Sequence, residues 1–289
     1  MLSLRNLHKT YANGVHATRD ISLDIPTGLF GLLGPNGAGK SSLMRTIATL
    51  QRPDSGSIHL DGVDVLAQPL AMRRQLGYLP QDFGVYPKVS ALELLNHFAI
   101  LKGITARGER REMVDALLQQ TNLWEVRRRA VHSYSGGMRQ RFGIAQALLG
   151  APRLVIVDEP TAGLDPDERN RFLNLLARIG EQVVVILSTH IVADVTDLCA
   201  RMAIIAAGRV VASGEPQAAI ASLHASIWQR GVRESMLADY QARYTVLSSR
   251  LQGGLPHIRV HSIEAPGDGF VPSPPSLEDL YFLTLRSVA

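Results

Sequence analysis

The chain has 289 residues, of which 46% are hydrophobic and 19% charged, and this length allows one large domain or two modest ones with a buried core. This composition excludes intrinsic disorder as the default state of the chain. The formal net charge of +4 is too small to choose among nucleic acid, anionic lipid headgroups and phosphorylated ligands as partners.

The sequence contains no stretch of about 18 consecutive apolar residues, which a membrane-spanning helix needs, and its first residues lack the layout of a signal peptide. We therefore expect that the chain does not cross a membrane on its own. Cys199 is the only cysteine, so no intrachain disulfide can form. We expect Cys199 to be a buried, small hydrophobic residue.

The first residues of the chain, 2–25, alternate short apolar stretches on either side of a turn at 11–14. This pattern predicts two strands of an antiparallel edge sheet. Tyr11 lies in or near the turn. Its ring either stacks on a nucleotide base or covers the sheet as a hairpin aromatic, and the spacing alone leaves both interpretations open.

Residues 34–41 match the phosphate-loop pattern G-x-x-x-x-G-K-[ST]. A buried strand is predicted before them at 29–33 and a helix after them at 42–50, the order that the motif requires. Glycines let successive N–H groups face phosphate oxygens, and the helix adds the positive end of its dipole. This context disfavours the alternative, a glycine turn that only packs a helix against a strand.

Within this loop, Lys40 is expected to reach the β- and γ-phosphates of a nucleotide, and the Ser41 hydroxyl to bind Mg²⁺. The residues expected to contact the nucleotide are Gly34, Pro35, Asn36, Gly37, Ala38, Gly39, Lys40, Ser41 and Ser42.

The middle of the chain changes character after a strand predicted at 76–80, which ends at Gln81. Apolar positions then recur at helical spacing, and we predict a mostly helical insert from about residue 86 to 149. The insert is rich in arginine, which indicates either a solvated helical face or a docking surface for an acidic partner. Its basic residues include Lys102, Arg107, Arg110, Arg111, Arg127, Arg128, Arg129, Arg139 and Arg141.

Two buried strands end in polar residues. The strand predicted at 153–157 is followed by Asp158 and Glu159, and the strand at 183–189 by His190. A helical pattern at 170–179 separates them, which predicts a parallel sheet of β-α-β units with its ligand at the carboxyl ends of the strands. Asp158 is placed to bind Mg²⁺, Glu159 to accept a proton from a water or to orient it, and His190 to hydrogen-bond the γ-phosphate. A merely charged turn after a buried strand is the alternative.

A strand pair at 202–206 and 209–214 closes this region, and we place a domain boundary after residue 215. Residues 216–289 predict a small α+β appendage, with strands near 226–228, 245–247 and 258–261 and a helix at 234–243. Ser276 to Asp279 have the capping-box spacing that begins a helix ending at about Arg286.

The stretch 132–141 contains Ser135, Gly136 and Gly137. Between a phosphate loop and an Asp-Glu strand end, it resembles the signature, usually written LSGGQ, of the ATP-binding subunits of ABC transporters. Tyr134 and Met138 stand where that signature has Leu and Gln, outside its Ser-Gly-Gly core. The resemblance covers residues 2–214. It implies an α/β P-loop NTPase fold of the ABC type: a parallel-sheet core, an antiparallel β edge subdomain and a helical insert, here followed by the appendage.

The resemblance also implies roles for single residues. Gln81 resembles the glutamine loop that senses Mg²⁺ and links to the membrane partner, and Leu164 with Asp165 resembles the D-loop. His190 resembles the switch histidine, and Tyr11 the aromatic that stacks on adenine. The expected catalytic residues are Glu159, His190, Lys40 and Gln81, and the expected Mg²⁺ ligands are Ser41, Gln81 and Asp158.

In this family two nucleotide domains sandwich two ATP molecules, each between the phosphate loop of one subunit and the signature of the other. The amides of Gly136 and Gly137 at a helix N-terminus suit such a second anion site. We therefore expect a homodimer, or a heterodimer with a related subunit. Ser135, Gly136, Gly137 and Asp165 would then complete the nucleotide contacts.

Residues 275–283 are similar to the closing segment of ATP-binding subunits that serve export-type (ABC-2) transporters. We therefore expect an ATPase subunit on the cytoplasmic face of the cell membrane that powers a separate membrane-spanning permease. A soluble ABC ATPase acting on nucleic acid or ribosomes is the alternative, which the pI of about 9.4 favours. The single nucleotide domain and the lack of sustained heptads disfavour it, and no nucleic-acid partner is expected. An inactive nucleotide-binding regulator is disfavoured because Lys40, Asp158, Glu159 and His190 are all present.

Overall fold

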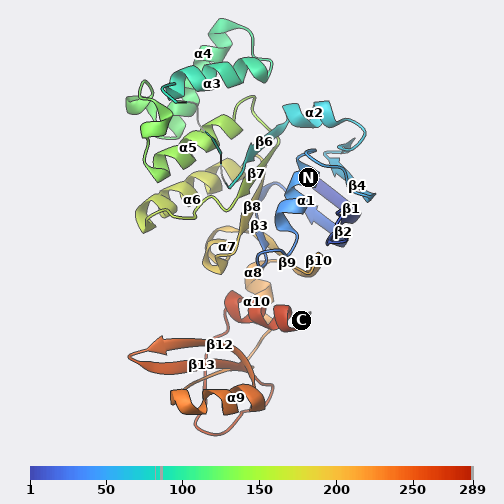
Figure 1. Cartoon of the computed structure of the whole chain (residues 1–289), viewed down its shortest axis with the longest axis vertical. Helices are drawn as coiled ribbons and strands as arrows, with labels where there is room; N and C mark the ends of the chain where they lie inside the picture. The colour runs from blue at the N-terminus through green and yellow to red at the C-terminus, as the bar shows by residue number, and fades with distance from the viewer. Residues whose placement is uncertain (82, 85–86, 288–289) are drawn as a thin grey trace.

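The computed structural model describes residues 1–81, 83–84 and 87–287. The described residues form three β-sheets. Figure 1 shows helices α3 and α4 at one end of the molecule and the sheet that contains β12 and β13 at the other. The predicted start of the insert at residue 86 and the last two residues of the predicted appendage lie outside the described residues.

The first sheet is antiparallel and has the strand order β2-β1-β4-β5. Leu2, Leu4, Leu23 and Ile25 alternate with exposed or half-buried residues and face one apolar core. The predicted antiparallel edge is therefore confirmed. The strands are β1 (Leu2–Thr10), β2 (His16–Ile25), β4 (Ser55–Leu60) and β5 (Val63–Asp64).

The central sheet has the strand order β10-β9-β3-β8-β7-β6, and every pairing in it is parallel except that of β9 with β10. The parallel-sheet core is therefore confirmed. Because β3, β8 and β7 are neighbours, the loops that follow these three strands lie at one edge of the sheet. The strands are β3 (Gly28–Leu33), β6 (Leu76–Leu79), β7 (Leu154–Asp158), β8 (Val184–Thr189), β9 (Arg201–Ala206) and β10 (Arg209–Gly214).

Each face of the central sheet packs into its own apolar core because neighbouring side chains of a strand point to opposite faces. In β3, Phe30 and Leu32 join the core that includes the first sheet, and Leu29 and Leu33 join the opposite core. The first core also contains buried residues of helix α1, and the second contains those of α6 and α7. These helices are α1 (Lys40–Ile47), α6 (Pro166–Gly180) and α7 (Val192–Leu198), and α2 (Pro69–Arg74) leads into β6.

The predicted insert consists of helices that share a third apolar core. Several of its basic residues make contacts within the fold: Lys102 Nζ donates a hydrogen bond of 2.6 Å to the Leu76 carbonyl, Arg127 stacks 3.7 Å above the Trp124 ring, and Arg141 forms an ion pair with Glu168. The elements are α3 (Ala91–Leu101), α4 (Arg107–Gln120), the 3-10 turns η1 (Trp124–Val126) and η2 (Val131–Ser133), and α5 (Gly136–Ala147).

Beyond residue 215 the chain contains short helices and a third sheet, whose strand order is β12-β13-β11-β14. The last helix, α10 (Leu277–Arg286), begins with the predicted capping box between Ser276 and Asp279. The other elements are α8 (Pro216–Ala221), β11 (Ile227–Gly231), η3 (Glu234–Met236), α9 (Leu237–Arg243), β12 (Thr245–Gln252), β13 (Leu255–His261) and β14 (Val271–Pro272).

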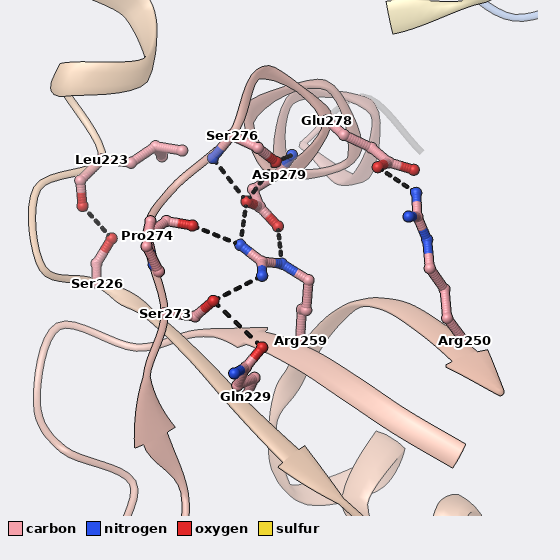
Figure 2. A network of polar contacts seen from close by, with 10 residues as sticks. All are labelled: Leu223, Ser226, Gln229, Arg250, Arg259, Ser273, Pro274, Ser276, Glu278 and Asp279. Carbon is pink, nitrogen blue, oxygen red and sulfur yellow. Dashed lines mark hydrogen bonds and ion pairs between the residues drawn. The ribbon is translucent and has the colours of Figure 1, made fainter. Parts of the chain in front are cut away.

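Helix α10 joins the appendage to the rest of the molecule. Its Leu277 and Tyr281 are buried in the same core as Val195 of α7. On the other side, Arg259 of β13 forms a forked pair with Asp279 of α10, at 2.8 and 2.7 Å (Figure 2). Helix α10 thus connects the sheet that contains β12 and β13 to the rest of the molecule.

Cys199 follows α7 and is 6% exposed, so the expectation of a buried cysteine is confirmed. Burial, and to a lesser extent the nearby Asp194, raise the pKa of its thiol to about 12, which makes it a poor nucleophile. Throughout the described ranges, no helix is long and apolar enough to span a lipid bilayer.

Candidate nucleotide site

The phosphate loop follows β3 and ends at Ser41, the second residue of α1. Gly34 has a φ angle of 159°, and a Cβ there would lie 2.3 Å from the Ile205 carbonyl oxygen. Gly39 has a φ angle of 105°, and a Cβ there would lie 2.1 Å from the Ala17 carbonyl oxygen. No larger residue fits at these two positions without moving backbone. The loop is therefore packed tightly against β9 and β2 at these two positions, which require glycine.

Lys40 is 5% exposed, and its Nζ donates hydrogen bonds to the carbonyls of Gly34 (2.6 Å) and Pro35 (3.1 Å). Burial lowers the pKa of Lys40, while the carboxylates of Glu159 and Asp158 oppose that effect. The ammonium group therefore lies within the loop, facing the carboxylates at the end of β7.

Asp158 ends β7 and is 7% exposed. Burial raises the pKa of its carboxyl group, whereas the hydroxyls of Ser188 and Ser41 and the charge of Lys40 act in the opposite direction. A hydroxyl and a carboxylate next to a phosphate cradle are the oxygen donors that Mg²⁺ uses together with nucleotide phosphates. The residues at this position therefore fit Mg²⁺, although the described residues contain no all-protein cluster of three or more metal ligands.

Glu159 has a left-handed backbone, with φ of 46°, which is unusual for a residue that is not glycine. Its N–H donates a 2.9 Å hydrogen bond to the carbonyl of Ser188 in the neighbouring strand. Its carboxylate Oε2 lies 3.2 Å from Nδ1 of His190. The strand ends of β7 and β8 thus bring these two predicted catalytic residues into direct contact.

A cleft of about 400 Å³ opens over the phosphate loop. It brings together most of the predicted nucleotide contacts. Strand β2 adds Ala17 to its lining. Its lining consists of Tyr11, Val15, Ala17, Pro35, Asn36, Gly37, Ala38, Gly39, Lys40, Ser41, Ser42, Gln81 and Glu159.

Tyr11 lines this cleft and is fixed by its hydroxyl group, which lies 3.0 Å from Ser42 Oγ and donates a 3.0 Å hydrogen bond to Gln51 Oε1. Gln51 in turn donates to the Ser42 carbonyl and to the Thr46 hydroxyl. The polar end of the ring is therefore held against α1 while Tyr11 lines the cleft. Gln51 was not among the predicted site residues, because only the folded contact reveals it.

A second cleft of about 330 Å³ shares Gln81 and Glu159 with the first. It is lined further by Phe83, Gly136, Arg139, Gln140, Ala162, Gly163 and Leu164. The two clefts therefore meet at Gln81 and Glu159, and the exposed Gly136 of the signature stretch belongs to the second one.

The signature stretch begins helix α5. Ser135 is its N-cap and accepts a 3.2 Å hydrogen bond from the Met138 N–H, so the serine hydroxyl closes the helix end. Tyr134, which replaces the usual Leu, is 4% exposed and donates to the Val126 carbonyl. This departure from the signature therefore serves the core of the insert.

Gly137 is covered by a side chain of the next helix. A Cβ at this position would lie 2.3 Å from Oε2 of Glu168 in α6, and the same carboxylate forms an ion pair with Arg141 of α5. Sequence reasoning missed Glu168, and its only signal was an acidic residue in the first turn after Asp165. This contact ties the signature helix to the helix after the D-loop.

Asp165 lies at the N-cap of α6, where its side chain accepts a 2.9 Å hydrogen bond from the Glu168 N–H. Five of the predicted site residues are not among the described residues that line the first cleft. They are Ser135, Gly137, Asp158, Asp165 and His190. The structure thus gathers the loop, Tyr11, Gln81 and Glu159 around one cleft and leaves the signature residues at its flank.

Comparison with known proteins gives a family match that covers the phosphate loop, the signature stretch and the strand end at Asp158 and Glu159. A family model described as ABC transporter matches residues 18–162.

Two relatives and one solved structure illustrate the similarity. The chain is 35% identical over 216 residues to the linearmycin resistance ATP-binding protein LnrL of Bacillus subtilis (strain 168), covering 74% of this chain and 69% of that protein. It is 39% identical over 211 residues to the daunorubicin/doxorubicin resistance ATP-binding protein DrrA of Streptomyces peucetius, covering 72% of this chain and 63% of that one. The dimeric structure of a post-hydrolysis state of the ATP-binding cassette MJ0796, bound to ADP and Pi, aligns with a TM-score of 0.67 and 27% identity, over 74% of this chain and 98% of that one.

Proposed function

The chain belongs to the ABC transporter family as an ATP-binding subunit that hydrolyses ATP for transport, and on this basis we propose that it powers a separate membrane-spanning exporter. One observation carries the enzymatic part: the phosphate loop, Gln81 and the Glu159 carboxylate surround a single cleft, and His190 contacts that carboxylate. The export direction is supported by relatives whose names refer to resistance to linearmycin and to daunorubicin or doxorubicin.

In the proposed reaction, the amides of residues 34–42 and the Lys40 ammonium bind the phosphates of ATP. Ser41, Asp158 and Gln81 would hold Mg²⁺, which neutralises phosphate charge when it is bound. Glu159 orients the attacking water and accepts its proton, and His190, 3.2 Å from Glu159 Oε2, fixes that carboxylate and hydrogen-bonds the γ-phosphate. Tyr11 stacks on the adenine from the wall of the cleft.

We propose that the complete site needs two subunits. Gly136 lies at the N-terminus of α5 and in the second cleft, which supports a role for its amide in binding a phosphate other than the one in its own loop. Ser135, Gly137 and Asp165 would contribute to the same contact across the interface. The similar cassette MJ0796 is a dimer in its solved structure, which supports a dimer for this chain as well.

The proposed partners are a membrane-spanning permease and a second ATP-binding subunit, and the proposed place of action is the cytoplasmic face of the membrane. Gln81 would transmit the state of the nucleotide to the permease together with the insert at about 86–149. Residues 1–215 would form the ATP-binding domain, and residues 216–289 an accessory domain. No nucleic-acid partner is proposed.

The first test of this proposal replaces the proposed catalytic carboxylate. Glu159→Gln should abolish hydrolysis while keeping ATP affinity, so the variant should elute as a dimer from a sizing column in ATP and as a monomer without it. Glu181→Gln, at the exposed end of α6, is a matched control and should behave as wild type. If Glu159→Gln remains monomeric in ATP while the wild type hydrolyses normally, the role of Glu159 is wrong.

The second test identifies the partner. The protein is extracted from its native membrane under mild conditions, and the proteins that accompany it are identified. Recovery of a protein with several membrane spans supports the transporter subunit, whereas recovery with ribosomes or DNA and none with membranes would contradict it.

A further inference from the structure

One buried carboxylate near the site has no role in the mechanism above. Asp194 lies in the first turn of α7 and its side chain is 1% exposed. Its Oδ1 accepts a 2.9 Å hydrogen bond from Nε of Arg169, whose second nitrogen also contacts it. Its Oδ2 accepts a 3.2 Å hydrogen bond from the hydroxyl of Thr161, which is 4% exposed. Both oxygens of the carboxylate are therefore occupied.

The three residues come from the three segments that surround the reacting end of the nucleotide. Thr161 follows Glu159 by two residues, in the turn between β7 and α6. Arg169 lies in α6, one turn after the D-loop residue Asp165. Asp194 lies one turn after His190. The loops that carry Glu159, Asp165 and His190 are thus joined at a single carboxylate.

Packing alone does not require a charge at this position. The neighbouring residue Val195 already joins α7 to the apolar core beneath the central sheet. A carboxylate removed from water costs several kcal/mol unless it is paired and fully hydrogen-bonded, and a buried ion pair is commonly no more stabilising than apolar residues of the same size. The buried carboxylate does fix the positions of its partners, because its hydrogen bonds to Thr161 and Arg169 form in only one arrangement of these side chains.

That geometry bears on catalysis. Glu159 and His190 meet at 3.2 Å, and Glu159 holds a left-handed backbone that its surroundings must maintain. A small displacement of a catalytic group can lower the rate of a reaction severely without changing the affinity for substrate.

We propose that Asp194 is a positioning residue for ATP hydrolysis. Through Thr161 and Arg169, it keeps the loops that carry Glu159 and His190 at a fixed position relative to each other. It does not touch the nucleotide. The inference rests on the proposed hydrolytic role of Glu159 and His190, and it assigns to Thr161, Arg169 and Asp194 an effect on the chemical step rather than on ATP binding.

The test compares hydrolysis and binding in variants of the full chain. Thr161→Val removes one hydroxyl at nearly constant volume, Thr161→Ser restores it, and Asp194→Asn removes the charge. Thr196→Val is the matched control, because Thr196 of α7 donates only to the Val192 carbonyl of its own helix. For each variant, kcat and KM are measured with Mg²⁺-ATP, the Kd of ATP without turnover, and the Tm.

Thr161→Val should lower kcat about threefold and Asp194→Asn about tenfold, with KM and Kd within about twofold of wild type. Thr161→Ser should recover most of kcat, and Thr196→Val should match wild type. An effect on packing alone would lower the Tm and the fraction of active protein in parallel and leave kcat per bound ATP unchanged, and that result would overturn the proposal.

Two outcomes separate this inference from the proposed function. If wild type hydrolyses ATP and Glu159→Gln does not, but Thr161→Val keeps the wild-type kcat, the positioning role is wrong and the proposed function stands. If wild type does not hydrolyse ATP, the proposed function itself fails. Should Asp194→Asn not fold, the comparison of Thr161→Val with Thr161→Ser decides the question on its own.

Discussion

At the scale of single residues, the nucleotide site is held by backbone positions that few side chains tolerate. Glu159 adopts a left-handed conformation, which costs a residue with a Cβ about 1–2 kcal/mol. Its N–H bond to the Ser188 carbonyl and the contact of its carboxylate with His190 hold it in this conformation. The strain therefore lies where the proposed chemistry occurs.

The closeness of the phosphate loop to β2 gives a prediction for two of its glycines. Gly39→Ala should abolish ATP binding, with Kd raised more than about a hundredfold, because its Cβ would lie 2.1 Å from the Ala17 carbonyl oxygen and must displace backbone. Gly37→Ala is the control, since its φ of 79° is equally left-handed but no atom lies within 4 Å of the added Cβ. Titration with a fluorescent ATP analogue measures both. Equal losses in the two variants would mean that φ rather than the contact with Ala17 decides.

At the scale of elements, α10 is held by a buried ion pair with several partners. Arg259 contacts the Asp279 carboxylate with two nitrogens and also donates to the Ser273 hydroxyl and the Pro274 carbonyl (Figure 2). The Ser276 hydroxyl and N–H also donate to Asp279. Because Asp279 is 2% exposed, its charge depends on all of these donors.

This network makes the attachment of the appendage sensitive to acid. Burial alone would raise the pKa of Asp279, but hydrogen bonds from Arg259 and Ser276 outweigh it and hold the pKa below its usual value. The stabilisation is therefore present above about pH 4 and lost as the pH falls through the lowered pKa of the folded state.

Asp279→Asn should accordingly lower the free energy of unfolding at pH 7 by about 2 kcal/mol and flatten its decline at acidic pH. Urea unfolding between pH 3 and pH 7 measures both quantities, with the fluorescence of Trp228 in β11 reporting on the appendage. Glu278→Gln is the control, since its ion pair with Arg250 is exposed and should contribute less than about 1 kcal/mol. An unchanged pH profile in Asp279→Asn would show that this carboxyl titrates alike in the folded and unfolded chain.

At the scale of the whole molecule, the two clefts divide the proposed ATP site between subunits. The first contains the phosphate loop and the second contains Gly136 of the signature, and both include Gln81 and Glu159. If each ATP is bound by the loop of one subunit and the signature of the other, defects in the two parts can complement each other.

Mixing two inactive variants tests this division. Lys40→Ala removes the phosphate-binding ammonium, and Gly136→Asp places a negative charge at the helix end that should meet phosphate. Each alone should be inactive, whereas a mixture contains heterodimers with one intact site and should regain up to about a quarter of the wild-type ATPase rate. ATPase activity in the mixture, with none in either variant by itself, supports the shared site. A mixture as inactive as its components, despite proven heterodimers, would contradict it.

Local sequence patterns predicted most of the helices, strands and motifs of this molecule. They could not predict contacts between segments that lie far apart in the sequence. The phosphate loop, the Asp158 and Glu159 strand end and the capping box at Ser276 could be predicted because each depends on neighbours in sequence. The contacts of Lys102 and Arg127 could not be predicted, because a basic side chain turns toward a carbonyl or a ring that only the folded chain places beside it.

The same limit applies within the candidate site. Two contacts in the site join segments about 30 to 40 residues apart in sequence, for which no periodic signal exists. They are the contact of Glu168 with Gly137 and the hydrogen bond from Tyr11 to Gln51. The roles assigned to the single site residues, Gln81 and Asp165 among them, stay predictions.

The position of α10 in the sequence has a consequence for how the protein is made. Its Leu277 and Tyr281 complete a core that Val195 and Cys199 enter about 80 residues earlier. At a synthesis rate of roughly 5–20 residues per second, the nascent chain carries this apolar surface uncovered for on the order of ten seconds. The appendage sheet emerges during that interval, so it has to fold beside an unfinished ATPase core before α10 covers both. The emerging chain therefore exposes this apolar surface to chaperones and to aggregation until α10 has been synthesised.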